Sequence, residues 1–321
     1  MASSAVSTGR EMRVVARREL AEGVVGVTLS PVDGGPAPDW TAGAHVDLVL
    51  SDALTRQYSL CGDRGDTETL SVAVLRAPAS RGGSKYVHGE LVVGTCVDVV
   101  GPRNHFELVN ADRYLFIAGG IGITPLIPMM QEAERRAIPW TLVYGGRSRS
   151  SMAFVADLVE HYGDKVFVRP EDETGLLDLT GAVRDADKGT AVYCCGPEPL
   201  LQAVEKVCEY ADHVSLHVER FAPKTQPDAA PAAGTFEVEL AKSGKTITVA
   251  RGETILDAVL AAGVAADFSC REGTCGTCEV AVLAGRPAHR DSVLTPDEQA
   301  ENDAMMICVS LSETPTLTLD I

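Results

Sequence analysis

The sequence predicts a multidomain chain made of an antiparallel β-barrel, a doubly wound α/β domain and a small α+β domain. Three observations lead to this fold class. Short β-like runs follow one another closely up to residue 110, strand-like and helical patterns alternate from 111 to 222, and a cysteine-rich loop lies beyond a stretch rich in Pro and Ala. At 321 residues the chain also exceeds what one hydrophobic core normally organises, so two or three domains are expected.

The first domain, residues 1–110, is expected to be the barrel. Gly, Pro and Asp turns separate its apolar runs, and little helical periodicity intervenes, which is typical of closely spaced antiparallel strands. The runs expected to form strands are Arg13–Ala16, Val24–Leu29, His45–Leu50, Leu70–Leu75 and Cys96–Val100.

The second domain, residues 111–222, is expected to be a parallel doubly wound sheet, because strands that alternate with helices indicate βαβ units. The expected strands are Tyr114–Ala118, Trp140–Tyr144, Val166–Arg169 and Ala191–Cys195. The expected helices are Pro125–Arg136, Met152–Tyr162 and Pro199–Tyr210.

Residues 223–233 are rich in Pro and Ala without hydrophobic periodicity, which is typical of a semi-rigid linker. In the third domain, residues 234–321, alternating runs flank Ser243-Gly244 as in a hairpin. Glu253–Ala262 then has helical spacing and ends at Gly263, a plausible C-cap. Two strands, a helix and then a metal loop match a small ferredoxin-like β-grasp domain.

That loop carries the most specific motif of the chain. Cys270, Cys275 and Cys278, followed by Cys308, have the C-x4-C-x2-C…C spacing of plant-type ferredoxins, which hold a [2Fe-2S] cluster on four thiolates. Gly273 and Gly276 let the backbone wrap closely and aim amide N–H groups at sulfur. A four-cysteine zinc site is the alternative, but such sites usually pair two C-x2-C knuckles and only one is present.

Three turns of the second domain follow strands and are candidates for binding a nucleotide. The first is glycine-rich and opens a helix, where amide N–H groups and the helix dipole favour a pyrophosphate; glycines also occur there for packing alone. The second offers Arg147 and Ser148 for ribose or phosphate, with a solvated loop as the alternative, and the third is Cys195-Gly196-Pro197. The candidates in the first turn are Gly119, Gly120, Gly122 and Thr124.

Two stretches of the first domain suit a phosphorylated, flat heterocycle. Residues 56–60 combine a cation, an aromatic ring and a hydroxyl in one short strand, where a phenol ring can stack and a guanidinium can bind phosphate. Residues 81–86 resemble a phosphate-binding helix start, with serine as N-cap or ligand. The candidates are Arg56, Gln57, Tyr58, Ser59, Gly82, Gly83 and Ser84.

Taken in order, RQYSL, RGGS, GPRNHF, AGGIGITP, CCGP, HVERFAP and CREGTCGTC resemble the phthalate dioxygenase reductase family. This family includes the reductase components of vanillate demethylase and carnitine monooxygenase. The resemblance covers the chain from about residue 11. It implies a flavin-binding barrel, a pyridine-nucleotide domain and a plant-type ferredoxin, with FMN, NADH and a [2Fe-2S] cluster as cofactors.

The resemblance also implies residue roles. FMN would bind at Arg56 to Ser59, at Ala73 and Val74, and at the turn of Gly82 to Ser84. NADH would bind at the three turns of the second domain, with Cys195 and Glu219 shaping the nicotinamide pocket and Phe221 stacking on the flavin. Arg149 adds a second cation to the ribose turn, so use of NADPH stays open.

The activity implied is that of a reductase that passes electrons from NADH through FMN and the cluster to an oxygenase. A Rieske non-haem iron oxygenase is favoured as the partner, and a haem-thiolate monooxygenase is the alternative. A stand-alone flavin reductase would have no use for the ferredoxin domain. An iron-sulfur redox sensor would need a DNA-binding element, and no basic stripe is present.

Composition narrows the partners and the compartment. The net charge of −17 argues against nucleic acid and anionic membranes. Residues 234–321 hold 14 acidic against 6 basic side chains, so a basic docking surface is expected on the partner. An apolar stretch at 114–130 is too short and too rich in Gly and Pro to span a membrane.

The odd total of nine cysteines and the absence of a signal peptide predict a reducing, cytoplasmic environment. A monomeric protein is expected. The remaining cysteines, apart from Cys195, are expected to be small buried hydrophobes: Cys61, Cys96, Cys194 and Cys208.

Overall fold

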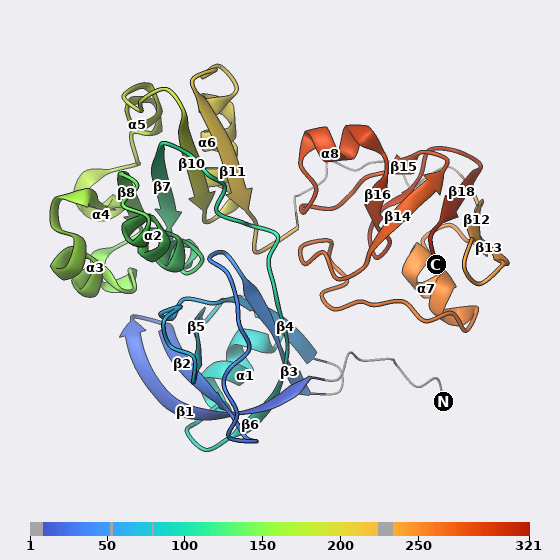
Figure 1. Ribbon diagram of the computed structural model, residues 1–321, viewed down its shortest axis with the longest axis horizontal. Coiled ribbons are helices and arrows are strands. Elements are labelled where there is room, and N and C mark those ends of the chain that lie inside the picture. Colours follow the sequence, from blue (N-terminus) through green and yellow to red (C-terminus); the bar gives the residue numbers. More distant parts are fainter. Residues whose placement is uncertain (1–8, 52–53, 79, 224–233) are drawn as a thin grey trace. The chain divides into compact units, whose positions relative to one another are not determined.

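The computed structural model describes residues 9–51, 54–78, 80–223 and 234–321. The described chain divides into two compact units, Gly9–Glu219 and Arg220–Ile321 (Figure 1). The first contains a six-stranded sheet and a five-stranded sheet, and the second a smaller mixed sheet. The predicted multidomain fold class is confirmed. Most of the expected linker, residues 224–233, lies outside the described residues.

The six-stranded sheet is antiparallel, with strand order β4-β3-β6-β1-β2-β5. A bridge between Leu60 and Val72 links the residue after β4 to β5, so the sheet curls into the predicted barrel. A short helix, α1 (Gly83–Gly89), follows β5. The strands are β1 (Arg10–Ala21), β2 (Val24–Pro31), β3 (His45–Ser51), β4 (Leu54–Ser59), β5 (Leu70–Leu75) and β6 (Cys96–Arg103).

The barrel forms because its strands alternate apolar and polar side chains. In β1, Met12 and Val14 are buried while Arg13 and Val15 are not. Because successive side chains of a strand point to opposite faces, this alternation places one face in the core. Leu48 of β3 is buried in the same cluster. The barrel therefore has its own hydrophobic core.

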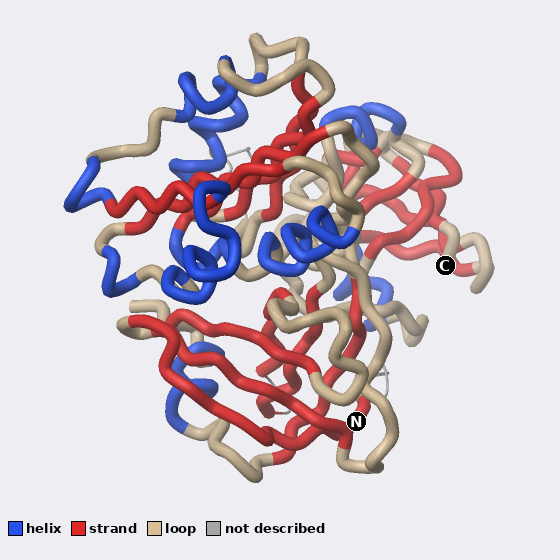
Figure 2. Tube along the Cα trace, turned by 60° about the vertical axis from the view of Figure 1, so that its left-hand side comes forward, coloured by secondary structure: helices blue, strands red, loops and turns tan. Residues whose placement is uncertain are grey.

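The five-stranded sheet is parallel, with strand order β11-β10-β7-β8-β9, as in a doubly wound fold. Figure 2 shows helices on both of its faces. Helices α2 and α3 pack against one buried cluster and α5 and α6 against another. The strands are β7 (Arg113–Gly119), β8 (Trp140–Gly146), β9 (Val166–Pro170), β10 (Thr190–Cys195) and β11 (Val214–Glu219). The helices are α2 (Leu126–Arg135), α3 (Val155–Tyr162), α4 (Glu171–Thr174), α5 (Leu179–Arg184) and α6 (Glu198–Cys208), with 3₁₀ turns η1 (Gly120–Ile123), η2 (Arg149–Ser151) and η3 (Gly163–Lys165).

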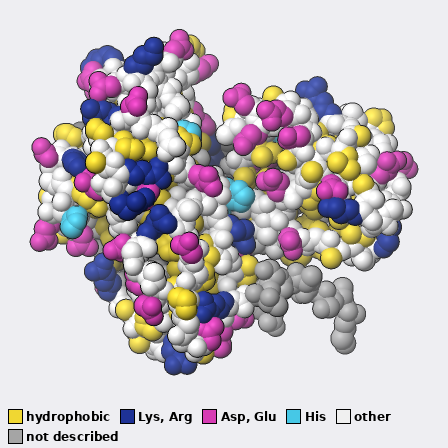
Figure 3. Space-filling model, viewed as in Figure 1, with side chains coloured by type: hydrophobic (Ala, Val, Ile, Leu, Met, Phe, Trp, Pro, Cys, Tyr) yellow, Lys and Arg dark blue, Asp and Glu magenta, His cyan; other side chains and the backbone are white. Residues whose placement is uncertain are grey.

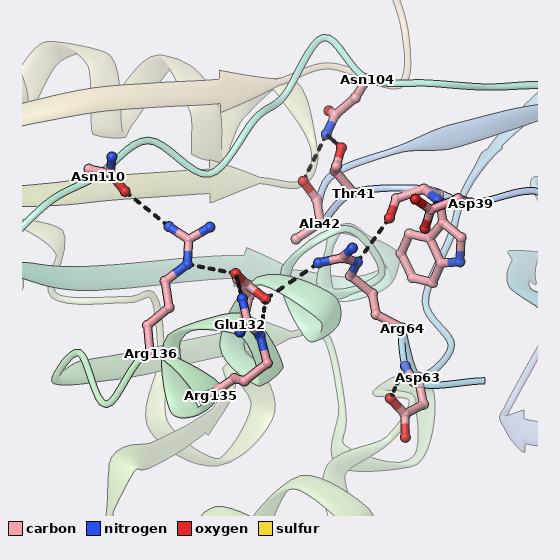
Figure 4. Close-up of polar contacts among 12 residues, drawn as sticks. Asp39, Thr41, Ala42, Asp63, Arg64, Asn104, Asn110, Glu132, Arg135 and Arg136 are labelled. Atoms are coloured by element: carbon pink, nitrogen blue, oxygen red, sulfur yellow. Dashed lines mark hydrogen bonds and ion pairs between the residues drawn. The ribbon is translucent and has the colours of Figure 1, made fainter. Parts of the chain in front are cut away.

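A polar network joins the barrel to α2 (Figure 4). Glu132 is only 5% exposed and accepts hydrogen bonds from Arg135 at 2.5 Å, from Arg136 at 2.6 Å and from Arg64 of the barrel at 3.4 Å. Arg64 also donates to the backbone carbonyl of Trp40 at 2.9 Å. The hydrogen bonds from Arg135 and Arg136 lower the pKa of Glu132 to about 2, against the opposing effect of burial. We call these five residues the Glu132 network.

The second unit is a mixed sheet with order β13-β12-β18-β14-β16, together with a two-stranded ribbon. Helix α7 begins at a Thr254 cap that accepts from Asp257, and Gly263 follows its end with a φ of 71°. The strands are β12 (Phe236–Leu240), β13 (Lys245–Val249), β14 (Glu279–Ala284), β15 (Pro287–Ala288), β16 (Ala304–Met306), β17 (Leu311–Ser312) and β18 (Thr316–Leu319). The helices are α7 (Ile255–Ala261) and α8 (Pro296–Glu301).

Candidate functional site

The carboxyl edge of the parallel sheet brings two of the predicted nucleotide-binding turns together. A Cβ added to Gly122 would lie 2.2 Å from the carbonyl oxygen of Cys195, and one added to Gly119 would lie 2.7 Å from Pro197. A Cβ on Gly196 would be 3.0 Å from the Cα of Gly119. These three glycines therefore allow the turns after β7 and β10 to pack backbone to backbone. Gly120 differs, because its φ is 54° and nothing lies within 4 Å of its Cβ position, which leaves the backbone open to a ligand.

Thr124, the fourth candidate of the first turn, is buried. Its hydroxyl donates to the carbonyl of Ile121 at 3.0 Å. The hydroxyl of Tyr144 donates to the carbonyl of Gly120 at 3.1 Å. Both bonds stabilise η1, so they hold the shape of the turn on which the open Gly120 backbone lies.

One carboxylate links three residues that are distant in the sequence. Glu219 ends β11, Cys195 ends the neighbouring β10, and Ser59 ends β4 of the barrel. The hydroxyl of Ser59 donates to Oε2 of Glu219 at 3.4 Å, and the Cys195 thiol donates to the same oxygen at 3.9 Å. We call these three residues the Glu219 cluster. A predicted flavin residue and two predicted catalytic residues thus meet at one point.

Electrostatics at the Glu219 cluster favour neutral side chains. Burial raises the pKa of Glu219 to about 8, although its hydrogen bonds with Ser59 and Cys195 act in the opposite direction. Burial, and then the neighbouring Glu219, raise the pKa of the fully buried Cys195 thiol. Cys195 is therefore a neutral thiol at neutral pH. It can contribute through its size and shape, but it does not supply a thiolate nucleophile.

Phe221, the third predicted catalytic residue, belongs to the second unit. Its side chain is 43% exposed. An aromatic ring with this much free surface is available for stacking, and its pairing with the flavin remains a prediction.

The predicted flavin strand β4 offers an aromatic face and a cation beside the turn at residues 81–84. Tyr58 is partly buried, which raises the pKa of its phenol to about 12. Arg56 donates to the carbonyl of Arg81 at 2.9 Å, and a Cβ on Gly83 would lie 2.4 Å from Cγ of Arg56. Glycine at 83 therefore lets the Arg56 side chain lie across the start of α1.

Other predicted flavin residues are partly engaged within the protein. Ser84 does not cap α1, since Gly82 is the cap residue and no side-chain cap bond forms; its hydroxyl instead accepts from the amide of Ala77 at 3.1 Å. Gln57 contacts His45 through their side-chain nitrogens at 3.3 Å. Ala73 and Val74 of β5 are both buried.

A cavity of about 340 Å³ lies beside the start of α1, and Arg76 and Lys85 contribute cations to its wall. Gly82 also lines it. A larger cavity, of about 630 Å³, is lined by barrel strands and by α2 and α3, and it contains none of the predicted site residues. The smaller cavity therefore borders the turn predicted to bind the flavin.

The predicted ribose turn is held by hydrogen bonds among its serines. The Ser148 hydroxyl donates to the Ser151 hydroxyl at 3.2 Å, and the Ser148 amide donates to the same oxygen at 3.3 Å. Arg147 is exposed, whereas Arg149 forms a two-point ion pair with Glu173 of α4. Glu173 was not predicted from the sequence; the acidic run at 171–173, directly after a strand, was the available signal.

The four predicted metal ligands gather in the second unit. Cys275, Cys278 and Cys308 are buried and Cys270 is half-buried. The Cys270 thiol interacts with those of Cys275 and Cys308, and the Cys278 thiol interacts with that of Cys308. These contacts lower the pKa of Cys270 and raise those of Cys275 and Cys308.

The cysteine loop also supplies backbone donors, as the sequence predicts. The amide of Glu272 lies 3.3 Å from Sγ of Cys270, and that of Thr277 lies 3.4 Å from Sγ of Cys275. Gly273 and Gly276 have φ values of 66° and 72°, which glycine adopts without strain. Among the described residues, no group of three or more His, Cys, Asp or Glu side chains forms a site for a single metal ion. The fit to a two-iron cluster therefore rests on the paired sulfurs, the amide donors and the spacing.

Of the other cysteines, Cys61 and Cys194 are buried as expected. The expectation is wrong for Cys96, which is exposed, because it begins β6 on the outward side of the barrel. Cys208 is intermediate.

None of the helices in the described parts of the chain combines the length and apolar character needed to cross a bilayer.

Comparison with known proteins gives a consistent result along the chain. The family described as "2Fe-2S iron-sulfur cluster binding domain" matches residues 238–313. Phenoxybenzoate dioxygenase subunit beta of Ectopseudomonas oleovorans is 48% identical over 294 residues, which are 91% of each chain.

Two solved structures resemble the whole chain. An intact type IV self-sufficient cytochrome P450 monooxygenase is 44% identical with a TM-score of 0.91; the match covers 98% of this chain, which spans 41% of the P450 chain. Phthalate dioxygenase reductase, described as a modular structure for electron transfer from pyridine nucleotides to [2Fe-2S], is 29% identical with a TM-score of 0.68, and the match covers 97% of each chain. These likenesses, together with the cysteine loop, confirm the family predicted from the sequence: the chain belongs to the phthalate dioxygenase reductase-like family.

Proposed function

We propose that this chain is the NADH-dependent reductase component of an oxygenase system and passes electrons through FMN and a [2Fe-2S] cluster to the oxygenase. When bound, the flavin would accept one hydride, which carries two electrons, and release these electrons one at a time, which suits a one-electron cluster. The observation that carries this function is the combination, in one chain, of the Glu219 cluster with a four-cysteine ferredoxin loop.

The turns at the sheet edge are proposed to hold NADH. The open backbone at Gly120 would face the pyrophosphate, with Gly119, Gly122, Gly196 and Pro197 shaping the two packed turns around it. Thr124 would hold the first turn in shape. Arg147 and Ser148, at the end of the adjacent strand β8, would position the adenosine ribose.

The barrel is proposed to hold FMN. Tyr58 would present a ring face and Ser59 a hydroxyl, while Arg56 and the turn of Gly82 to Ser84 would bind phosphate beside the 340 Å³ cavity. Gln57, Ala73 and Val74 would border the same site. Phe221 would cover the flavin, and Glu219 and Cys195 would shape the space next to it without supplying charge at neutral pH. Cys270, Cys275, Cys278 and Cys308 would ligate the cluster.

We further propose three functional domains, residues 1–110, 111–222 and 234–321, joined by the linker at 223–233. A cytoplasmic location suits a chain whose nine cysteines form no disulfide. A monomeric state is part of the same proposal.

The proposed partner is a Rieske-type non-haem iron oxygenase. The family resemblance supports this choice, and the relative from Ectopseudomonas oleovorans is named as a dioxygenase subunit. The haem-thiolate alternative has its own support in the likeness to the self-sufficient P450. Acidic side chains gather around α8 in the view of Figure 3, which suits a basic docking surface on either partner.

Stopped-flow absorbance with NADH under anaerobic conditions tests the function. The proposal predicts that flavin absorption is lost before cluster absorption, and loss in the opposite order would contradict it. Product formation with purified Rieske oxygenases and haem-thiolate monooxygenases, each supplied with this chain and NADH, tests the partner. Turnover with the haem-thiolate enzymes alone would overturn the Rieske assignment.

A further inference from the structure

The ion pair between Arg149 and Glu173 has a position that bears on which nicotinamide cofactor the site accepts. In doubly wound folds the glycine-rich turn follows one strand, and the neighbouring strand ends near the adenosine ribose of the bound nucleotide. An acidic side chain there suits the ribose hydroxyls of NADH, and an arginine accommodates the 2′-phosphate of NADPH. The turn after β8 occupies this place and carries the arginine, Arg149, while the acidic side chain, Glu173, reaches it from α4, which follows β9. A role for this ion pair in cofactor choice rests on the proposed nucleotide site.

Glu173 holds both edges of the Arg149 guanidinium. Nε of Arg149 donates to Oε1 of Glu173 at 3.0 Å, and Nη2 donates to Oε2 at 2.7 Å. This two-point geometry is the one that an arginine would also use for a phosphate. The bond raises the pKa of Arg149 and lowers that of Glu173. Because both side chains are about half exposed, the pair contributes little to folding stability, and its geometry matters more than its strength.

The position of Glu173 is set by contacts of the backbone around it. The amide of Asp172 donates to the carbonyl of Arg147 at 3.2 Å, which docks α4 on the ribose turn. The Thr174 hydroxyl donates to the carbonyl of Pro170 at 2.9 Å. Leu177 then packs so close to the end of β8 that a Cβ on Gly145 would lie 3.0 Å from it. The carboxylate is therefore presented to Arg149 by an anchored segment.

A second acidic side chain flanks the turn from the barrel. Glu22 lies between β1 and β2; its amide donates to the carbonyl of Ser150 at 2.8 Å, and its carboxylate accepts from the Ser150 hydroxyl at 3.2 Å. With Glu171 and Asp172 also beside the turn, a 2′-phosphate would meet several carboxylates while the guanidinium of Arg149 is already occupied. Repulsion between these carboxylates and the phosphate would disfavour binding of a 2′-phosphate.

We propose that Glu173 is a specificity-determining residue, which keeps Arg149 from binding a 2′-phosphate and so reserves the site for NADH. Removing its charge frees a two-point phosphate ligand, and one negative charge is lost from the site. Both changes favour NADPH.

The test compares 2′,5′-ADP with 5′-AMP as probes, by calorimetric titration of the full-length holoprotein. Glu173→Gln is expected to improve the ratio of 2′,5′-ADP to 5′-AMP affinity by about tenfold, from a freed charge-assisted contact and reduced repulsion. Glu171→Gln is the matched control, since it removes the same charge from the same helix without a hydrogen bond to Arg149, and its effect should be smaller. The ratio of kcat/KM for NADPH and NADH should follow the binding ratio.

A double variant tests whether Arg149 is the side chain that binds the 2′-phosphate. In Arg149→Gln/Glu173→Gln the gain for 2′,5′-ADP should be mostly lost, because the arginine that binds the phosphate is gone. An unchanged ratio in Glu173→Gln, an equal gain in Glu171→Gln, or a gain that survives in the double variant would overturn the proposal. If 5′-AMP fails to compete with NADH in the unaltered protein, the nucleotide site itself is wrong and the proposal falls with it; competition combined with an unchanged ratio refutes only the role of Glu173.

Discussion

At the scale of single residues, the Glu219 cluster shows how the fold tunes ordinary side chains. Glu219 lies where a parallel sheet meets a barrel, so little water reaches its carboxyl group, and burial outweighs two hydrogen bonds in setting its pKa near 8. Cys195 shares this environment and stays protonated. At the proposed nicotinamide and flavin site, a neutral carboxyl would avoid placing negative charge next to a flavin that becomes negative on reduction.

Glu219 should make the protein less stable as pH rises. A carboxyl whose pKa is higher in the folded state contributes stability that is fully present below its unfolded value of 4.5 and lost as pH rises through about 8. Relative to Glu219→Gln, the wild type should lose about 2 kcal/mol over this window, less than the shift alone implies because the Glu219 residue as a whole is only partly buried. Urea unfolding from pH 5 to 9 measures the difference, and parallel curves for the two proteins would refute the shifted pKa.

Gly122 tests the packing of the two turns. The methyl group of Gly122→Ala would lie 2.2 Å from the carbonyl oxygen of Cys195, and neither backbone can yield without moving a turn. We expect a loss of about 1–3 kcal/mol in stability and at least about tenfold weaker NAD⁺ binding. Gly89→Ala is the control, because nothing lies within 4 Å of its Cβ position. Equal behaviour of the two variants in calorimetric NAD⁺ titrations would contradict this account.

At the scale of elements, α2 does more than cover the sheet. The Glu132 carboxylate of α2 accepts a hydrogen bond from Arg64 of the barrel, and Arg64 also donates to the Trp40 carbonyl. One carboxylate therefore connects the helix on the parallel sheet to the barrel. We infer that this connection helps to hold the barrel against the sheet where Ser59, at the end of β4, meets Glu219, at the end of β11.

Glu132→Gln should weaken this connection. A carboxyl whose folded pKa is lowered stabilises the protein above its unfolded value of 4.5, and this contribution is lost as pH falls towards about 2. We expect a loss of about 2 kcal/mol at pH 7, less than the shift alone implies because Arg135 is largely exposed. Thermal unfolding of both proteins at pH 7 and at pH 3 measures this stability difference, which should be smaller at pH 3.

Glu134→Gln provides the comparison on the same helix, since Glu134 binds Lys165 and Trp140 and makes no contact of this kind with the barrel. If both variants lose the same stability, or if the Glu132→Gln loss is undiminished at pH 3, the network does not act as described.

The elements that sequence patterns predicted are those with long apolar periodicity. The strands β2, β3, β5, β7 and β10 and the helices α2 and α6 were expected at nearly their observed positions. Strand β11 was not predicted, because its apolar alternation covers only Val214, Leu216 and Val218, and neither was α4, which has four residues. Strands β15 and β17 have two residues each, which is too short for periodicity to register.

The sequence predicted the cysteine ligands of the candidate site better than the contacts between residues far apart in the chain. The cysteine spacing identified the cluster ligands because four thiolates must come from one short loop and one later strand end. Contacts across long separations could not be predicted, since no local pattern reports that Ser59 lies beside Glu219 or that Glu173 reaches Arg149. Those pairs depend on how strands are ordered in the sheets.

At the scale of the whole molecule, the chain has the parts of a route for electrons. The first unit contains most of the proposed residues for NADH and FMN, and the second contains the cysteine loop and, in residues 234–321, almost half of the net negative charge. Because the proposed two-electron and one-electron sites lie in different units, we expect that either can be removed while the other is retained.

The central claim is that electrons leave through the cysteine loop after the flavin has been reduced, and Cys275→Ser tests it most directly. We predict flavin reduction by NADH within about twofold of wild type, because the first unit is unaltered, and at least about a hundredfold slower reduction of cytochrome c, because a cluster ligand is lost. Cys96→Ser, an exposed cysteine of the barrel, should leave both rates at their wild-type values. Cytochrome c reduction at the wild-type rate in Cys275→Ser, despite loss of the cluster, would contradict the account.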